Sequence, residues 1–315
     1  MHNRERVVIT GVGGYIGSSL AGSIRGSYSV VGVSRGARFH SLESLFGDTV
    51  KLVRADIADT EGIKKAAEGA RVIVHGAGPV TESFCREQPE EARRVIVEGT
   101  RGIADIARSN NALLVYLSTL SVYPAGGVGE SLTETINPAP DSVYGRLKAE
   151  AESIVRSNDA IILRLAHIYG KSPVLPSRGH LVTDIFVDKA VRGEPIVIYG
   201  DGSECIDLVH IRDVVRLISL LIESRKAPHP IMNVTAGEPV TINRLAEEVQ
   251  NACRLVTGKE LVICHEPFPQ GKSHKTRILS AALLRTFAPW LPSISLEEGI
   301  GEMVSYRYAN HDEQK

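Results

Sequence analysis

The sequence has almost no net charge and no long apolar run. Its 315 residues include 36 Lys and Arg against 37 Asp and Glu, which leaves a formal net charge of −1. A chain with so little net charge lacks the excess of basic residues that is typical of nucleic-acid-binding proteins. No apolar run reaches the ~18 residues of a membrane-spanning helix, and the short polar lead before the first strand does not fit a signal peptide. We therefore expect a cytoplasmic protein with neither nucleic acid nor membrane as a partner.

Cysteine is equally scarce. The four cysteines are far apart, with no CxxC pair and no histidine at zinc-ligand spacing: Cys85, Cys205, Cys253 and Cys264. This pattern predicts free thiols in a reducing compartment and no metal site. Because 43% of the residues are hydrophobic, the chain can build the core of one large or two small domains.

A glycine-rich turn, Thr10-Gly-Val-Gly-Gly-Tyr-Ile-Gly17, lies near the start of the chain. The β-branched run before it is typical of a buried parallel strand, and the apolar spacing after it fits a helix. In such a unit Gly11 permits the tight turn, Gly14 lets backbone amides approach a pyrophosphate, and Gly17 lets the helix pack on the strand. The predicted dinucleotide contacts in this turn are Gly11, Gly14, Tyr15, Ile16 and Gly17.

Further apolar runs alternate with helical patterns. The runs are 28–34, 50–53, 71–75, 112–117 and 160–163, and the clearest helical stretches are 90–107 and 143–155. This alternation predicts the α/β class, with a Rossmann-type doubly wound parallel sheet. Ligands of such sheets bind at the carboxyl ends of the strands. We therefore expect further cofactor contacts from Ser34, Arg35, Asp56, Ile57, Gly76, Ala77, Gly78 and Leu117.

The end of the second strand bears on the choice of cofactor. An acidic residue at this point binds the ribose hydroxyls of NAD, whereas a nearby Arg suits the 2′-phosphate of NADP. The chain has Ser34 and Arg35 there and no acidic residue. The sequence thus favours NADP(H) over NAD(H). The alternative is that Arg35 is a solvated loop cation.

Three polar residues form the predicted catalytic group. Tyr144 and Lys148 are four apart on a predicted helix, so both side chains can point into one cleft. A nearby ammonium stabilises a phenolate and lowers the pKa of the phenol. Thr119, at the end of a predicted central strand, can hold a substrate oxygen against that phenol. Beside a dinucleotide site, such a group can move a proton while a hydride moves to or from nicotinamide.

The order of these motifs resembles that of the extended short-chain dehydrogenase/reductases, in the group of nucleotide-sugar epimerases, dehydratases and reductases. The resemblance includes five later segments: 161–170 (IILRLAHIYG), 198–202 (IYGDG), 207–213 (DLVHIRD), 232–237 (MNVTAG) and 295–299 (SLEEG). It implies that Tyr144 is the acid/base, that Lys148 binds the ribose and tunes the phenol, and that Thr119 holds the substrate oxygen. It also implies a nucleotide-sugar substrate.

Domain organisation and assembly are further expectations. We expect a cofactor domain of residues 1–165 and 195–226, and a smaller α+β substrate domain of residues 166–194 and 227–315. The resemblance implies a homodimer formed through the helices at 90–107 and 143–155.

The chain departs from the group at three places. Ile96 stands where the group often has an Asn that orders the site. Leu120 and Ser121 stand where many members have Asp and Glu, so 4,6-dehydration would lack both of its carboxylates. Ile206 stands where an Arg usually grips the nucleotide diphosphate. Either another cation binds the phosphates or the substrate is not a nucleotide sugar; the other cations considered are Arg178, Lys272, Lys275 and Arg277.

One branch is most similar around the sugar. The step Tyr123-Pro124 and the loop ending Ser177-Arg-Gly-His180 resemble the GDP-4-keto-6-deoxymannose epimerase/reductases, which use a Cys and a His on the sugar. Ser121 occupies the Cys position, and a hydroxyl is a far weaker acid than a thiol, which argues against epimerisation. The predicted substrate contacts are Thr81, Ser121, His167 and His180. The alternatives are a helix-capping role for His180 and a hydrogen-bonded core position for His167, and we expect structural hydrogen bonds from His75 and His210.

Three functions remain open at this point. The favoured one is an NAD(P)(H)-dependent oxidoreductase that acts on a sugar-like carbonyl or alcohol. The second is a nucleotide-sugar 4-epimerase whose tightly held NAD takes a hydride and returns it. The third is a cofactor-sensing regulator that keeps the fold without the chemistry, against which the intact Thr119, Tyr144 and Lys148 argue.

Overall fold

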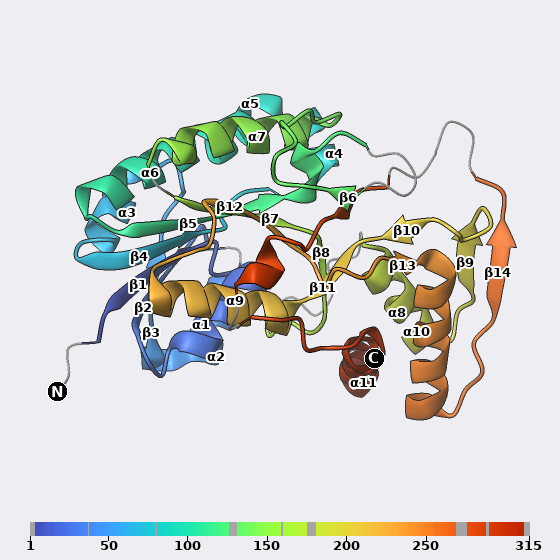
Figure 1. Ribbon diagram of the computed structural model, residues 1–315. Coiled ribbons are helices and arrows are strands. Elements are labelled where there is room, and N and C mark those ends of the chain that lie inside the picture. The colour runs from blue at the N-terminus through green and yellow to red at the C-terminus, as the bar shows by residue number, and fades with distance from the viewer. Residues whose placement is uncertain are drawn as a thin grey trace.

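Seven parallel strands form the central sheet in the computed structural model, which describes residues 4–36, 38–79, 81–125, 131–158, 160–174, 181–268, 276–287 and 290–311 (Figure 1). The strands are β1 (Arg6–Thr10), β2 (Ser29–Ser34), β3 (Val50–Arg54), β4 (Ala70–His75), β5 (Leu113–Thr119), β7 (Ile161–Leu165) and β12 (Ile231–Val234). Their order is β12-β7-β5-β4-β1-β2-β3, so the chain winds outward in both directions from the neighbours β1 and β4. The carboxyl ends of these two strands mark the switch point at which such sheets bind ligands.

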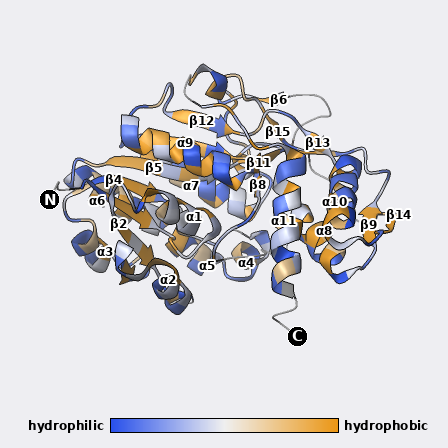
Figure 2. Ribbon diagram, turned by 90° about the horizontal axis from the view of Figure 1, so that it is seen from below, coloured by the Kyte–Doolittle hydropathy of each residue, from blue (hydrophilic) through white to orange (hydrophobic). Residues whose placement is uncertain are grey.

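Alternate residues of each strand face two different apolar cores. Val7 and Ile9 of β1 pack on one side, while Val8 packs on the other. A strand buried on both faces needs apolar residues in succession, which explains the near-continuous Val, Ile and Leu runs. The central strands are accordingly hydrophobic along their length in Figure 2.

Helices cover both faces of the sheet (Figure 1). One face carries α1 (Tyr15–Ile24), α2 (Phe39–Phe46) and α9 (Ile211–Ser224). The other carries α3 (Thr60–Ala66), α6 (Gly99–Ser109) and α7 (Val143–Arg156). The predicted doubly wound α/β fold is thus confirmed. Within the described residues, no helix is both long and apolar enough to cross a membrane.

The helix predicted at 90–107 is interrupted near its middle. Two short helices, α4 (Glu82–Glu87) and α5 (Pro89–Arg93), precede a π-helical turn, η2 (Arg94–Glu98), which leads directly into α6. Single π turns within α-helices are frequently found at functional sites. Here the turn contains Ile96, the residue that stands in place of the expected Asn. The homodimer expected through this helical run and α7 stays a prediction.

A second unit lies at one end of the sheet (Figure 1). Its helices α8 (Val182–Arg192), α10 (Ile242–Thr257) and α11 (Leu296–His311) share an apolar core with β9 (Ile196–Tyr199), which pairs with β14 (Ile263–Glu266). Three further two-stranded pairs are β8 (His167–Tyr169) with β11 (Leu208–His210), β10 (Cys205–Ile206) with β13 (Val240–Thr241), and β6 (Ser131–Leu132) with β15 (Ile278–Leu279). The 3₁₀ turns are η1 (Gly47–Thr49), η3 (Leu120–Val122) and η4 (Leu284–Thr286).

Two strands pair in a different unit from the one that the predicted domain boundaries give them. β12 falls in 227–315, expected in the substrate domain, yet it pairs with β7 at the edge of the central sheet. β9 falls in 195–226, expected in the cofactor domain, yet it pairs with β14. Both are short apolar runs, and the pattern of such a run does not say which sheet it joins. The remaining division into two domains stays a prediction.

Candidate active site

A cavity of about 950 Å³ opens at the carboxyl ends of the central strands. Its walls come from the β1–α1 turn, the ends of β2, β4 and β5, the first turns of α7, and the segment between β7 and β8. The predicted cofactor and catalytic residues that line it are Gly11, Gly14, Tyr15, Ile16, Gly17, Ser34, Arg35, Ile57, Gly76, Ala77, Gly78, Leu117, Thr119, Tyr144 and Lys148. The cavity therefore joins the two sites that the sequence predicted separately.

The glycine turn has the close approaches expected of a dinucleotide cradle. Gly11 has a φ of +76°, and a Cβ there would lie 2.8 Å from the carbonyl oxygen of Gly76. A Cβ on Gly17 would lie 2.3 Å from the carbonyl oxygen of Gly11. Gly14 is the N-cap of α1 and has no side chain with which to satisfy the first-turn amides. These amides and the helix dipole suit a pyrophosphate, so the residues present fit a dinucleotide.

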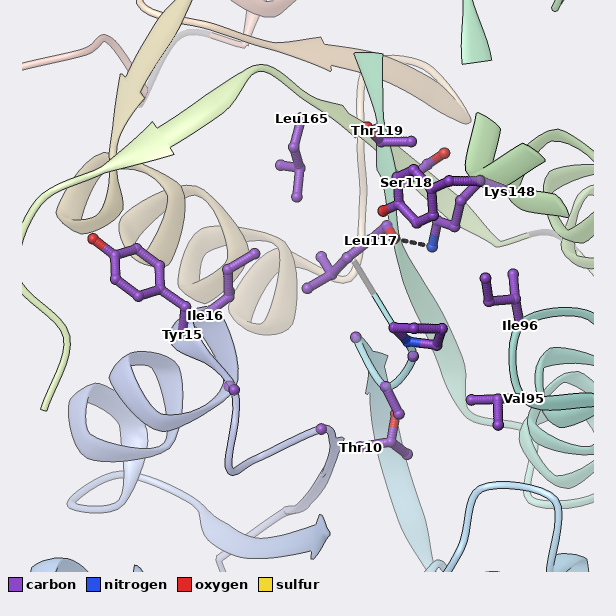
Figure 3. A pocket seen from close by; sticks show the side chains of 18 of the residues that line it. Thr10, Tyr15, Ile16, Val95, Ile96, Leu117, Ser118, Thr119, Lys148 and Leu165 are labelled. Atoms are coloured by element: carbon purple, nitrogen blue, oxygen red, sulfur yellow. Dashed lines mark hydrogen bonds between the residues drawn. The ribbon is translucent and has the colours of Figure 1, made fainter. Parts of the chain in front are cut away.

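Tyr15 lies apart from Leu117, which is near the centre of the view, beside Lys148 (Figure 3). The Tyr15 hydroxyl donates to the carbonyl oxygen of Gly170, so its ring ties α1 to the end of β8. Leu117 lines the cavity, and a Cβ on Gly76 would lie 2.9 Å from its side chain. The predicted turn at Gly76 is therefore packed closely against β5.

Arg35 lines the cavity just after β2 and belongs to a cluster of charged side chains. Arg35 Nη1 lies 3.4 Å from Glu91 and 3.9 Å from Asp56. Arg94 contacts both carboxylates more closely, at 2.7 Å and 3.0 Å. The hydrogen bond from Arg94 is the main reason that the pKa of Asp56 lies below its usual value. Asp56 is paired with Arg94 in this structure. Its predicted contact with the cofactor stays a prediction.

His75 lies behind the glycine turn and is fully buried. Its Nδ1 is 2.7 Å from the Thr10 hydroxyl, and its Nε2 is 2.9 Å from the Thr100 hydroxyl. Burial, followed by the charge of Lys148, lowers the pKa of His75 to about 3. The ring is thus neutral and structural, as the sequence predicted. His210 also has the predicted structural role, since its Nδ1 accepts from the backbone of Arg212 at the start of α9.

Thr119 and Tyr144 line the same cavity. Thr119 is the last residue of β5, and Tyr144 is in the first turn of α7, which Ser142 caps by accepting from Gly145 N at 2.9 Å. Burial raises the pKa of Tyr144, the nearby Cys85 raises it further, and the Thr119 hydroxyl acts in the opposite direction. At neutral pH the phenol is therefore a neutral acid held beside a hydroxyl.

Lys148 is buried one helical turn after Tyr144, with 8% of its surface exposed. Its Nζ donates to the carbonyl oxygen of Leu117 at 2.7 Å and lies 4.1 Å from the centre of the Tyr116 ring (Figure 3). Burial lowers its pKa to about 7, although the charge of Glu152 acts in the opposite direction.

The expected effect of Lys148 on the phenol is not found in this structure. The sequence predicted a pKa of Tyr144 depressed by the neighbouring ammonium, whereas burial of the ring raises that pKa. Burial disfavours the charged form of both groups. In addition, the Lys148 ammonium contacts the Leu117 carbonyl and the Tyr116 ring. Two residues on one helical face need not interact when a third group holds one of them.

Glu82 is a site residue that the sequence analysis missed. Its carboxylate accepts hydrogen bonds from the backbone amides of Val143, at 3.1 Å, and Tyr144, at 2.9 Å. It also pairs with Arg86 at 2.7 Å and lines the cavity. A carboxylate at a helix N-terminus satisfies amides that the helix itself cannot. The only local signal was an acid at the start of α4, 62 residues from Tyr144.

The predicted substrate contacts are partly described. Thr81, Ser121 and His167 line the cavity. The Thr81 hydroxyl caps α4 by accepting from Phe84 N, and the backbone amide of Ser121 donates to the Thr119 hydroxyl at 3.1 Å. His167 Nδ1 lies 3.2 Å from the carbonyl oxygen of Asp207. His180 lies outside the described residues.

Of the four cations considered for a diphosphate, only Arg277 falls within the described residues. It lines the cavity, donates from Nε to the carbonyl oxygen of Tyr123 at 3.0 Å, and pairs with Asp141. Arg178, Lys272 and Lys275 lie outside the part of the chain that the structure describes.

Comparison with curated proteins finds relatives along the whole chain. A probable UDP-glucuronate 4-epimerase of Rhizobium meliloti is 27% identical over 97% of this chain and 98% of its own length. A UDP-glucose 4-epimerase of Mycolicibacterium smegmatis is 28% identical over 96% of this chain and 98% of its own.

Solved structures agree with these relatives. A UDP-glucose 4-epimerase of Thermus thermophilus, in complex with NAD, has a TM-score of 0.79 and 27% identity over 96% of this chain and 99% of its own. One of Thermotoga maritima, at a TM-score of 0.81 and 24% identity, covers 96% and 99% and shows the shared fold. A sequence model of the NAD dependent epimerase/dehydratase family matches residues 7–235. The chain therefore belongs to the NAD dependent epimerase/dehydratase family, within the extended short-chain dehydrogenase/reductases.

Proposed function

We propose that the protein is an NADP(H)-preferring oxidoreductase that interconverts a carbonyl and an alcohol on a sugar nucleotide. The observation that carries this proposal is that Thr119, Tyr144 and Lys148 line the same cavity as the glycine turn. The nucleotide-sugar substrate is supported by the relatives, whose names specify UDP-sugars.

The side chains suit proton transfer to a substrate oxygen. When bound, the nicotinamide supplies a hydride donor or acceptor. The raised pKa of Tyr144 keeps its proton in place at neutral pH, so the phenol can donate it to a carbonyl oxygen as that oxygen gains charge. The Thr119 hydroxyl orients the same oxygen. Lys148 contacts Leu117 and Tyr116 and does not lower the resting pKa of Tyr144, but its positive charge at the same cavity would favour the phenolate that proton transfer leaves.

The preference for NADP(H) rests on the end of β2. Ser34 and Arg35 line the cavity there, and neither repels a 2′-phosphate. Arg35 is only loosely engaged by Glu91 and Asp56, since Arg94 makes the shorter contacts with both. Its guanidinium can therefore turn to a phosphate without breaking a tight ion pair.

Two measurements test the proposal. Thermal denaturation with NADPH, NADH and several UDP- and GDP-sugars identifies ligands, because saturation to ~100 times Kd stabilises the folded state by ~2.7 kcal/mol. Turnover of a stabilising pair should then change the nicotinamide absorbance, and Tyr144→Phe should abolish that change. If no cofactor raises the melting temperature, the proposal is wrong.

A 4-epimerase is the second candidate, because both curated relatives and the Thermus thermophilus structure are named as 4-epimerases. Such an enzyme returns its hydride, so it interconverts two sugar nucleotides with no net change in nicotinamide absorbance. Chromatography of the sugar products separates the two activities. A regulator that only senses the cofactor would bind it without any turnover and would tolerate Tyr144→Phe.

A further inference from the structure

A buried ion pair lies beneath the catalytic residues. Glu152 on α7 is 2% exposed, and Arg164 on β7 is fully buried. Arg164 Nη2 donates to Glu152 Oε2 at 2.7 Å, and its Nε lies 3.1 Å and 3.2 Å from the two carboxylate oxygens. This is a forked contact that fixes both the distance and the orientation of the two side chains.

The pair connects the elements that carry the catalytic residues. Glu152 follows Lys148 by one helical turn on α7. Its Oε1 also accepts from the hydroxyl of Ser118 at 2.5 Å, and Ser118 directly precedes Thr119 on β5. In the sheet, Ser118 stands opposite Arg164. One carboxylate thus joins the catalytic helix to the strand of Thr119 and to its neighbour β7.

Arg164 extends the connection beyond the pair. Its guanidinium carbon lies 4.7 Å from the centre of the Tyr123 ring, and the Tyr123 hydroxyl donates to Asn233 Oδ1 at 2.7 Å. Asn233 is on β12, which pairs with β7. The network therefore runs from α7 across the sheet to its edge strand.

Stability alone does not account for charges at this depth. Replacing a buried ion pair with apolar residues of similar volume is often neutral or stabilising, because desolvation offsets the attraction. The pair is also incomplete, since Nη1 of Arg164 has no hydrogen-bond partner among the described residues. A buried donor without a partner adds to the cost. The charges are better explained by the positions that they fix.

The charge of Glu152 also bears on Lys148. The other titratable groups around the ammonium are Tyr144 on its own helix, Tyr116 from β5 and His75 from β4. Burial favours the neutral forms of all three at neutral pH. Cys85, near Tyr144, is likewise kept neutral by burial. Among these groups Glu152 alone supplies a negative charge.

We propose that the Glu152–Arg164 pair is a positioning device for Lys148, which fixes α7 against β5 and β7 and places a carboxylate one helical turn from the ammonium. Arg164 holds the carboxylate in one orientation. Glu152 is thus a positioning residue that acts through Lys148. The inference rests on the proposed function, in which Lys148 supports proton transfer by Tyr144.

The test measures the titration of Lys148 directly. Trace labelling of amines with acetic anhydride across a pH series, followed by mass spectrometry of the Lys148 peptide, follows the unprotonated fraction without any substrate. Glu152→Gln keeps the size of the side chain and removes its charge. We expect the midpoint of its Lys148 titration to fall by about one pH unit. The alkaline limb of the kcat/KM profile should move to lower pH by the same amount.

Two further variants separate charge from packing. Arg164→Met keeps the carboxylate, so the midpoint pH of the Lys148 titration should stay the same or rise, while kcat falls. A matched control is Asp184→Asn in the second unit, where Asp184 forms a buried pair with Arg307 between α8 and α11. It should lower the melting temperature to a comparable extent and leave the Lys148 titration unchanged.

Each outcome decides the matter. A wild-type titration in Glu152→Gln, or an equal fall in Arg164→Met, would overturn the inference. If Glu152→Gln does not fold, the double variant Glu152→Leu with Arg164→Met replaces it, and a normal Lys148 titration there would overturn the inference equally. A shifted titration in a protein that turns over no nucleotide sugar would instead refute the proposed function alone.

Discussion

The Lys148 ammonium lies over the face of the Tyr116 ring, 4.1 Å from its centre, and donates to the carbonyl oxygen of Leu117. A ring face and a carbonyl are partial substitutes for the water that a cation loses on burial. They do not compensate fully, and burial lowers the pKa of Lys148 to about 7. The residue on which the proposed chemistry depends is therefore held at a cost to the folded protein.

Lys148→Met should make the folded protein more stable and lower its activity. The unfolded chain keeps the proton on Lys148 up to about pH 10.4, whereas the folded chain releases it near pH 7. The contribution of Lys148 to the free energy of unfolding therefore rises with pH between these values and is least favourable below pH 7. We expect the variant to gain a few kcal/mol near pH 6 and less near pH 9, as measured by urea unfolding, and to lose at least ~100-fold in kcat. A variant that is less stable at both pH values would contradict this account.

Thr119→Val should reduce kcat/KM by roughly 10²- to 10³-fold, because it removes one group that orients the reacting oxygen while keeping the size of the side chain. Thr119→Ser should retain most of the activity. Thr183→Val is a matched control, since the buried Thr183 hydroxyl on α8 has no hydrogen-bond partner among the described residues. That control should leave turnover unchanged. Equal activity of Thr119→Val and Thr119→Ser would remove Thr119 from the mechanism.

Much of the fold could be predicted because its signals are local. The centres of β1 and β4 are runs of three apolar residues, VVI and VIV, and only a strand covered on both faces requires such runs. The glycine turn could be placed because a Cβ on Gly17 would collide with the carbonyl oxygen of Gly11. Tyr144 and Lys148 are one helical turn apart, so their shared face followed from spacing alone.

The parts that escaped prediction depend on distant pairing. Glu82 contacts the amide of Tyr144 from 62 residues away, and nothing near Glu82 in the sequence indicates that contact. Nothing near Arg94 in the sequence indicates its ion pair with Asp56 either. Asp56 was expected to contact the cofactor. The direction of the pKa shift of Tyr144 also depends on burial, which the tertiary structure sets.

Asp207 should make stability depend on pH in the opposite direction to Lys148. Burial raises its pKa to about 6, although hydrogen bonds from the Thr235 hydroxyl and the Leu279 amide oppose the shift. The folded chain thus holds a proton that the unfolded chain releases near pH 3.9. The associated stability is complete below pH 3.9 and is lost as pH rises through about 6, by at most about 3 kcal/mol.

Asp207→Asn should remove this dependence. The measurement is the free energy of unfolding of both proteins at several values between about pH 4 and 7. Asp105→Asn is the control, because Asp105 is an exposed residue on α6. If wild type and Asp207→Asn show parallel pH dependence, the carboxylate is ionised in the folded protein despite its burial.

Arg35→Ala should weaken NADPH binding by about 10- to 100-fold and leave NADH binding nearly unchanged, since the two cofactors differ only in the 2′-phosphate. Glu91→Gln should have the opposite effect, because Glu91 lies 3.4 Å from Arg35 and competes with a phosphate for it. Titration calorimetry with both cofactors measures the two differences. Equal losses for NADPH and NADH in Arg35→Ala would mean that Arg35 stacks on the adenine or supports the loop. The cofactor preference would then have to come from residues other than the end of β2.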